Sequence, residues 1–450
     1  MNLPDLYDSK LGTLLSFFFR RRQSPAVWAT GAVQRPIDAA VLLAACTVLS
    51  FIPITLGTVL VHNLLTSISQ SSTQIILIVL CVATVVTGRV TFGWAACGAC
   101  VVAFFVAISQ LIAVLHSPST EKNYVMPSVF GAFLLAGPVA MSLARKVKIE
   151  NSGRYVARIV SFLLGFFVVE CITRFVFSPF LRTKIVLDLY GADALGTDGP
   201  LYRYKYSVFF ADSNATGLAL LCLIAMLLIF REYISNRQML LAYVLMLGTV
   251  SRASITAAFC QFLIYKFWRH RRWVLSAIAA AAPFAIMSLF GAFVTRPESI
   301  DAIDKSFATK FLILQRMMSA YSQADTLQRL VGIGAGNAEG LIGIAAHSIV
   351  ATFVLELGFL GSALVMIYVW LLSRGSTKAF YLLLVPMVVN GFSLIATSMP
   401  YFYVTLGILG VLRGTEIQPS KCERRDLATG NSLWRALRAG IRSASRAPVA

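Results

Sequence analysis

Long apolar runs alternate with short polar or basic segments along most of the chain. A run can span a membrane when it crosses about 30 Å of hydrocarbon at about 1.5 Å per residue. By this measure the pattern predicts twelve membrane-spanning helices, of which the second, sixth, seventh, eighth and twelfth are short. The predicted spans cover residues 39–62, 72–88, 95–116, 125–144, 155–178, 215–230, 238–250, 253–267, 274–294, 346–372, 379–396 and 399–413.

The composition agrees with this pattern, because 58% of the residues are hydrophobic and 13% are charged. These proportions are typical of a polytopic membrane protein and exclude an ordinary soluble domain. Residues 1–38 lack the apolar core and small-residue cleavage site of a signal peptide, so no cleavable leader is expected. A net charge of +19 would suggest nucleic-acid binding in a soluble protein. Here the positions of the basic residues in the loops between the predicted spans explain the positive charge better.

Lysine and arginine set the orientation through the positive-inside rule. With the N-terminus placed inside, most of the 39 basic residues fall in inner segments, and the inverted topology would reverse that ratio. The sequence therefore predicts a cytoplasmic N-terminal segment (1–38), a transmembrane domain (39–413) and a basic cytoplasmic tail (414–450). Both termini are expected in the cytoplasm.

Two long outer segments remain, at about 179–214 and 295–346. Loops of this length are usually functional or disordered. The first holds Arg203 and Lys205 in a tyrosine-basic alternation, LYRYKYSVFF, that would suit sugar stacking or a polymer exit. The second lies between the ninth and tenth spans and contains the amphipathic pattern FATKFLILQRMMSAYSQ, which predicts a helix at the membrane interface.

The most unusual polar cluster lies in residues 331–361, around the start of the predicted tenth span. An ionised side chain at membrane depth costs about 2.5–3.5 kcal/mol, so such a cluster is a candidate functional site. Gly334 and Gly336 would let the backbone approach a ligand closely. His347 and Glu356 would point toward a similar face of a continuous helix. The alternatives are a hydrogen-bonded interfacial histidine and a glutamate paired with an arginine.

Further candidates lie where predicted spans meet at the outer surface. Arg252 follows a short span, so its guanidinium, a planar fork that suits phosphate, is expected to face the protein interior. The alternative is an arginine that extends to the surface. Asp212 and Asn214 at the start of the sixth span are candidate substrate contacts, and the alternative for them is a helix N-cap.

Four other charged residues, Arg316, Arg329, Glu170 and Arg174, are interpreted from their position and spacing in the chain. Arg316 and Arg329 lie in the second outer loop, where a solvated side chain is the alternative to a ligand contact. Glu170 and Arg174 are four residues apart inside the fifth span, which favours a structural ion pair. Cys97 and Cys100 form a CxxC pair, but within an apolar helix they are interpreted as packing residues rather than as a redox or metal pair. No other acidic, histidine or cysteine set suggests a metal site, so no metal and no other cofactor is expected. No cysteine lies in a predicted outer loop, so no disulfide framework is expected.

The order and placement of these motifs resemble the O-antigen polymerase and ligase superfamily of bacterial envelope glycan assembly. The resemblance covers about residues 200–365, and the first 200 residues add only the topology. Ser348 stands where the family usually has an asparagine, and no tryptophan follows Arg316. The matching positions are Arg316, the G-x-G-x-G glycines Gly332, Gly334 and Gly336, His347, the E-x-G-x-x-G residues Glu356, Gly358 and Gly361, Ser251-Arg252, and Asp212-Ser213-Asn214.

The resemblance implies an all-α, GT-C-like polytopic protein of the bacterial inner membrane, with a large periplasmic loop between helices 9 and 10. Such proteins take a glycan from an undecaprenyl-diphosphate carrier on the periplasmic face and need no metal. Arg252 and Arg316 would then stabilise the diphosphate leaving group, and His347 would assist the acceptor hydroxyl as a catalytic residue. The residues expected to bind substrate are Arg203, Lys205, Asp212, Asn214, Gly334, Gly336 and Glu356.

The favoured function is a polymerase that joins lipid-linked oligosaccharide repeat units into growing exopolysaccharide or O-antigen. A chain-length regulator and a flippase are the protein partners that such a polymerase suggests, and nucleic acid is not a partner. One alternative is an O-antigen ligase that passes finished glycan to a lipid A core or a protein. A second is a polysaccharide transporter or lipid-linked sugar flippase, which should show repeated halves. No convincing half-to-half repeat is evident in the sequence.

Overall fold

The computed structural model describes residues 36–52, 72–118, 124–148, 153–190, 204–210, 213–270, 273, 277, 305–342, 348–391 and 399–412. Within these residues all regular secondary structure is helical and no strand occurs. The predicted all-α class is therefore confirmed for the described part of the chain. The predicted ninth span, 274–294, and both terminal segments lie outside the described residues, apart from positions 36–38 and 277.

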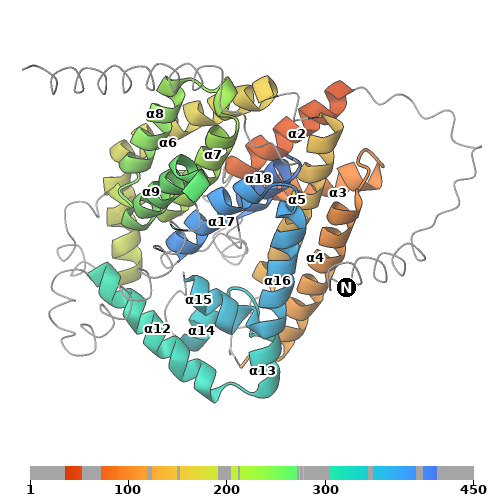
Figure 1. Ribbon diagram of the computed structural model, residues 1–450. Coiled ribbons are helices and arrows are strands. Elements are labelled where there is room, and N and C mark those ends of the chain that lie inside the picture. The colour runs from red at the N-terminus through yellow and green to blue at the C-terminus, as the bar shows by residue number, and fades with distance from the viewer. Residues whose placement is uncertain are drawn as a thin grey trace, which may run out of the picture.

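One group of helices consists of the four that correspond to the first four predicted spans, together with α16 and α18. In this group α4 packs against α5 and α16, and α5 packs against α18. These six helices form one side of the bundle in Figure 1. Their bounds are α2 Pro36–Phe51, α3 Ser72–Val86, α4 Trp94–Leu115, α5 Val125–Lys146, α16 Gly358–Ser373 and α18 Pro400–Gly410.

A second group forms the other side of the bundle. Nearly every residue of α7 is buried, which explains why its sequence is apolar all round rather than on one stripe. Helix α17 packs against α7 and α9 and connects this group to α18. The bounds are α6 Gly153–Tyr190, α7 Ser213–Ile229, α8 Asn236–Gly248, α9 Arg252–Lys266 and α17 Thr377–Gly391, with short 3₁₀ turns η4 Arg231–Tyr233 and η5 Trp268–His270.

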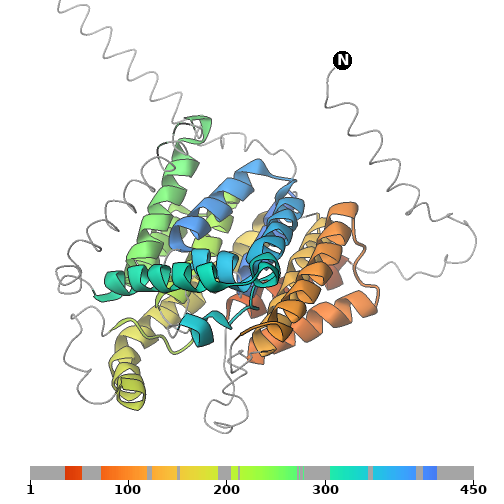
Figure 2. The same ribbon diagram turned by 90° about the horizontal axis from the view of Figure 1, so that it is seen from below.

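A set of short elements closes one end of the bundle. The amphipathic pattern in the second outer loop does form a helix, α12, which crosses the end of the bundle (Figures 1 and 2). A small apolar cluster beneath it is separate from the main core and draws on α12, the following loop and α14 to η6. The bounds are α12 Lys305–Gln323, α13 Thr326–Val331, α14 Ala338–Ile342, α15 Ile349–Ala351 and the π-helix η6 Thr352–Glu356.

Two helices differ from their predicted spans. The predicted single helix over 346–372 is wrong, because the chain runs through α15 and the π-helix η6 and then breaks before α16. The break falls at Gly358, whose φ of 62° is incompatible with a continuous helix. Helix α6 continues to Tyr190, past its predicted end at residue 178 and with Pro179 inside it. The first outer loop is therefore shorter than predicted.

The surface of the bundle fits a membrane protein. Three described helices are long and apolar enough to cross a bilayer, Trp94–Leu115, Met126–Lys146 and Gly153–Pro179, and six more are apolar but shorter. Helix α4 turns its alanines inward and leaves Phe104, Phe105 and Leu111 exposed. Small residues inside and large apolar residues outside are typical of helices that pack within lipid. The predicted total of about twelve spans is not confirmed.

The connections between helices gather at two ends of the bundle, as alternating spans require. The end that carries α12 is called the α12 end below. The pairs in contact there are His116 with Gln328, Lys205 with Ser213, Asn214 with Ser251, and Ile349 with Gly391. The pairs in contact at the opposite end are Arg89 with Lys146, Ala40 with Tyr155, Trp94 with Arg374, and Tyr265 with Lys378.

Candidate functional site

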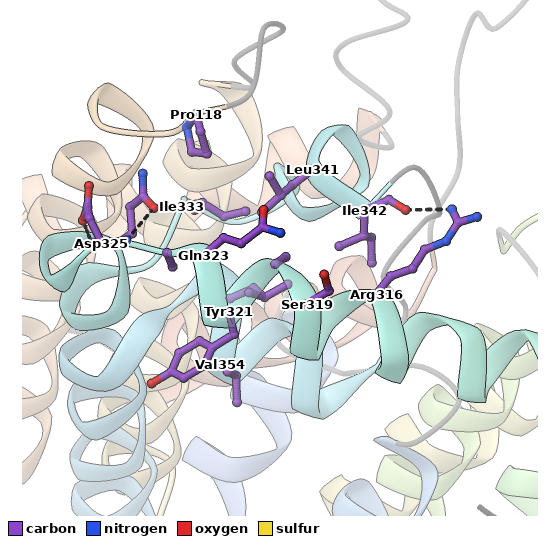
Figure 3. Close-up of a pocket in the computed structure, with 14 residues that line it drawn as sticks. Pro118, Arg316, Ser319, Tyr321, Gln323, Asp325, Ile333, Leu341, Ile342 and Val354 are labelled. Carbon is purple, nitrogen blue, oxygen red and sulfur yellow. Dashed lines mark hydrogen bonds between the residues drawn. The ribbon is translucent and has the colours of Figure 1, made fainter. Parts of the chain in front are cut away.

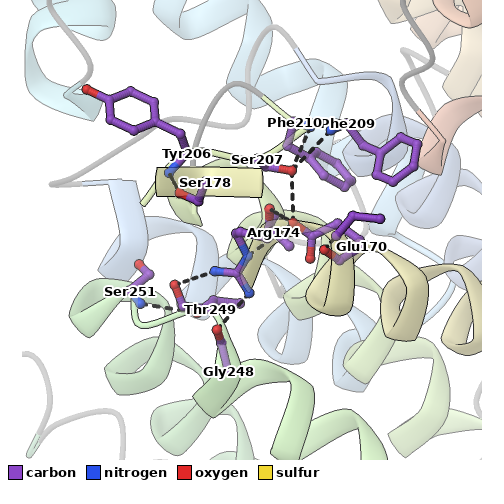
Figure 4. Close-up of polar contacts among 12 residues, drawn as sticks. Glu170, Arg174, Ser178, Tyr206, Ser207, Phe209, Phe210, Gly248, Thr249 and Ser251 are labelled. Carbon is purple, nitrogen blue, oxygen red and sulfur yellow. Dashed lines mark hydrogen bonds and ion pairs between the residues drawn. The ribbon is translucent and has the colours of Figure 1, made fainter. Parts of the chain in front are cut away.

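A buried ion pair organises the α12 end of the second helix group. Arg174 and Glu170, both 1% exposed, face each other on α6 with Nε and Oε1 3.2 Å apart (Figure 4). The predicted structural pair is therefore confirmed. The guanidinium also donates to the carbonyl oxygens of Gly248 (2.7 Å) and Thr249 (2.8 Å) at the end of α8. Positive charge at a helix C-terminus is favourable, so Arg174 fixes the turn that leads to α9.

Glu170 connects the same ion pair to the segment before α7. Its Oε1 accepts from the hydroxyl groups of Ser207 (2.9 Å) and Thr216 (3.2 Å). Ser207 Oγ in turn accepts from the N–H groups of Phe209 and Phe210 (Figure 4). The carboxylate is thus charge-paired and hydrogen-bonded, which is the condition for keeping it in an apolar interior. Segment 204–210 is held against α6 by this network.

A chain of polar side chains continues across three helices. Ser251, the N-cap of α9, donates to Asn214 Oδ1 (2.7 Å) and lies 2.9 Å from Ser254 Oγ. Ser254 donates to Asn390 Oδ1 on α17 (2.9 Å), and both of these residues are fully buried. The structure therefore brings the start of α7 next to the Ser251-Arg252 turn, although 37 positions separate them in the chain. Sequence reasoning missed Ser254 and Asn390, because a single polar residue in an apolar run also occurs as ordinary packing.

Arg252 is exposed on the first turn of α9, which corrects the expectation that it faces the protein interior. The buried arginine of this region is Arg174 instead. The reason lies in the orientation of α9: its buried face carries Ser254, Ala257 and Gln261, and residue 252, two positions before Ser254, falls on the other face. The residue is exposed at the α12 end.

A close packing contact joins this region to the second candidate region. At the end of α17, a Cβ added at Gly391 would lie 2.9 Å from Cβ of Ile349, the first residue of α15. Ile349 is two positions after His347, which lies outside the described residues. Ser348 has extended backbone and caps α15 without a side-chain hydrogen bond.

The second region contains a cavity of about 460 Å³ between α12 and the elements that follow it (Figure 3). Arg316 lies toward one end and Asp325 toward the other, with Ser319, Tyr321 and Gln323 between them along α12. The lining therefore combines a cation, a carboxylate, a hydroxyl, an amide and an aromatic ring. The remaining lining residues are Pro118, Ala320, Ala324, Gln328, Ile333, Leu341, Ile342, Val354 and Leu355.

Arg316 is exposed, and its Nη1 donates to the carbonyl oxygen of Ile342 at the end of α14 (2.9 Å). A guanidinium has five N–H donors, and this contact with the described residues uses one of them. The side chain is therefore oriented by a helix end and still has donors for an anionic ligand. Arg329, the other arginine of this loop, stacks over Tyr321 and donates to the Ser322 carbonyl oxygen.

The floor of the cavity is built by an interlock of two chain segments. Gly332 has φ 80° and Gly358 has φ 62°, and a Cβ on either would overlap the backbone of the other segment. The N–H of Ile333 donates to the carbonyl oxygen of Leu355 (2.9 Å), and the N–H of Gly334 donates to the carbonyl oxygen of Glu356 (3.1 Å). The glycines therefore allow the chain to approach its own backbone. We call the contact of residues 332–336 with 355–358 the glycine interlock.

Glu356 is buried in the interlock. Its carboxylate accepts from the backbone N–H of Gly336 (3.1 Å). It thereby holds the loop against η6. Gln110 of α4 also contacts the interlock, and sequence reasoning missed it. The available signal was a lone Ser-Gln pair within an otherwise apolar predicted span.

The predicted site residues fall into three sets. Lys205, Asn214 and Arg252 lie in the first region, where Asn214 contacts the Ser251 turn and the Lys205 carbonyl accepts from the Ser213 N–H. The second region contains the cavity and the interlock, with Arg316, Gly334, Gly336 and Glu356. Arg203, Asp212 and His347 lie outside the described residues.

Among the described residues no group of three or more His, Cys, Asp or Glu side chains is placed to hold a metal ion. Comparison with protein-family models gives no match, and no curated protein is significantly similar in sequence. The resemblance to the glycan polymerase and ligase superfamily therefore rests on the motifs and on their placement.

Proposed function

We propose that this protein is an integral membrane glycosyltransferase that joins lipid-linked oligosaccharide repeat units into a polysaccharide at the α12 end. One observation carries the proposal. Two motif regions from distant parts of the chain lie at the same end of an apolar bundle and are in contact through Gly391 and Ile349. Each region presents an exposed arginine there, Arg252 in one and Arg316 in the other.

The proposed reaction transfers the growing glycan from undecaprenyl diphosphate to a hydroxyl of the next repeat unit. The acceptor oxygen attacks the anomeric carbon, and the bond from that carbon to the diphosphate oxygen breaks. His347 takes the acceptor proton, and Arg252 and Arg316 stabilise the negative charge that develops on the diphosphate. This transfer involves no change of oxidation state and needs no metal ion. The planar fork of arginine suits phosphate oxygens, and both residues are exposed.

The cavity beneath α12 suits the glycan part of such a substrate. Its lining offers the amide of Gln323, the hydroxyl of Ser319 and the carboxylate of Asp325 as partners for sugar hydroxyls. Tyr321 supplies an aromatic ring of the kind on which sugar rings stack. A volume of about 460 Å³ is within the range of small-ligand sites.

In this proposal the α12 end faces the periplasm and the opposite end faces the cytoplasm of a bacterial inner membrane. The positions of basic residues support this orientation. Arg89, Lys146, Arg231, Arg374 and Lys378 all lie at the opposite end. The positive-inside rule assigns the more basic end to the cytoplasm.

Polymer growth by the purified protein tests the proposal. The protein in lipid nanodiscs is given undecaprenyl-diphosphate-linked repeat units, and the products are resolved by length. A ladder of chains that grows with time is the expected result. Transfer only to an added lipid A core would assign the protein as a ligase. Movement of the lipid-linked sugar across vesicles without new glycosidic bonds would assign it as a flippase and overturn the glycosyltransferase proposal.

A further inference from the structure

Gln110 contacts the glycine interlock from outside the cavity. It lies on the buried face of α4, near the helix end, and its side chain is 0% exposed. Its Oε1 accepts from the N–H of Ala335 (2.8 Å), and its Nε2 donates to the carbonyl oxygen of Glu356 (3.4 Å). The two ends of one amide therefore hold both segments of the glycine interlock. A buried amide is costly unless it is hydrogen-bonded in this way.

Four successive loop N–H groups, those of residues 333 to 336, all have acceptors although they belong to no helix. The acceptors for Ile333, Gly334 and Gly336 come from residues 355 and 356. The acceptor for Ala335 is Gln110 on α4. Gln110 thus ties the interlock to a long helix of the bundle. A second hydrogen bond to the end of α4, from Gln328 Nε2 of α13 to the His116 carbonyl oxygen (3.4 Å), is exposed and starts outside the interlock.

We propose that Gln110 is a positioning residue, which fixes the interlock to α4 and so sets the cavity floor without touching the substrate. Ile333 and Leu355 of the interlock line the cavity directly, as does the neighbouring Val354. Ile333 and Leu355 are joined by a backbone hydrogen bond within the interlock, so a shift of the loop moves the floor. The proposed consequence for the reaction rests on the proposed function, whereas the mechanical role of Gln110 does not.

Hydrogen exchange tests the mechanical role without any substrate. In the wild-type protein the amides of residues 333–336 should exchange slowly despite their place in a loop, because each is hydrogen-bonded. Gln110→Leu keeps the size of the side chain and removes both contacts. Exchange of these amides should then accelerate on the order of 10-fold or more, the change expected for a lost buried hydrogen bond. Exchange in peptides from α7 should stay the same.

Gln261→Leu is the matched control. Gln261 is also fully buried, and its Nε2 bridges the carbonyl oxygens of Leu221 (3.0 Å) and Leu382 (2.7 Å) in the bundle. This variant removes the same chemistry far from the cavity and should leave exchange at 333–336 unchanged. Gln110→Glu keeps an acceptor for the Ala335 N–H and should restore part of the protection.

The polymer assay supplies the readout that a merely structural role would not change. Gln110→Leu should raise the KM for the lipid-linked repeat unit about 10-fold with a smaller change in kcat, and Gln261→Leu should not. Unchanged exchange in Gln110→Leu would overturn the proposal, and so would faster exchange with an unchanged KM. A wild-type protein that forms no polymer would overturn the proposed function instead, and the exchange result would still decide the mechanical role of Gln110.

Discussion

Arg174 and Arg316 both donate to backbone carbonyl groups at the end of a helix, but their surroundings are opposite. Arg174 is 1% exposed, is paired with Glu170 and contacts two carbonyls after α8. Arg316 is exposed at the edge of the cavity and contacts the carbonyl at the end of α14. The contact with backbone carbonyls therefore secures the turn after α8 in the case of Arg174. In the case of Arg316 it orients a guanidinium that still has N–H donors for a ligand.

The difference shows that burial decides the role of each arginine. A buried guanidinium must be fully paired, so all of its interaction energy is committed to the fold. An exposed guanidinium with one backbone contact keeps most of its donors for a ligand. Removing the first should damage folding, and removing the second should damage only binding or catalysis. Substitutions at Arg174, Arg316 and Arg252 test this comparison, and one at Gly358 tests the cavity that Arg316 borders; the positions follow in order of decreasing effect.

Arg174→Ala should have the largest effect. It leaves Glu170 as an uncompensated buried charge, which destabilises a protein by about 3–5 kcal/mol. The melting temperature and yield of the detergent-solubilised protein measure the loss. Arg158, exposed on the same helix, provides the control Arg158→Ala, which should have little effect. Equal stability of the two variants would show that the buried pair does not secure the fold.

Arg316→Ala should leave the melting temperature nearly unchanged and reduce polymer formation by about 10²–10³-fold, as expected when a group that stabilises developing charge is lost. His347→Ala should abolish polymer formation while the protein still inserts. Arg158→Ala is again the control, because Arg158 is exposed on α6 and does not line the cavity. Normal chain-length ladders from Arg316→Ala and His347→Ala would contradict the enzymatic proposal.

Gly358→Ala tests whether the interlock shapes the cavity region. The left-handed backbone costs a non-glycine residue about 1–2 kcal/mol, and the new methyl group would overlap the backbone of Gly332 in addition. Both stability and activity should fall. Gly165→Ala is the control, since a Cβ there meets open space in a helix. A fully stable and active Gly358→Ala protein would show that the interlock can open without consequence.

Arg252→Lys should have the smallest effect among these. Lysine keeps the charge but cannot reproduce the planar fork, so polymer formation should fall about 10-fold, by the loss of one hydrogen bond to phosphate. Arg252→Ala should abolish polymer formation while the protein still inserts. Full activity of Arg252→Lys in the length-resolved assay would argue against bidentate phosphate contact.

Local sequence patterns determined much of this protein. The apolar runs predicted most helices with bounds close to the observed ones, because helix formation in an apolar segment depends on nearby residues. The amphipathic pattern predicted α12, and the four-residue spacing of Glu170 and Arg174 predicted their ion pair. These features need only residues within a few turns of one another.

The tertiary structure alone decided how distant segments meet. The helix break at Gly358 follows from the approach of the backbone near Gly332, and no local signal specifies that approach. Likewise, Gln110 gains a role only because α4 lies beside the interlock, and Arg252 faces outward because α9 packs its other face into the bundle. Hydropathy measures the preference of each segment for lipid, whereas polar contacts across the bundle depend on which neighbours the fold supplies.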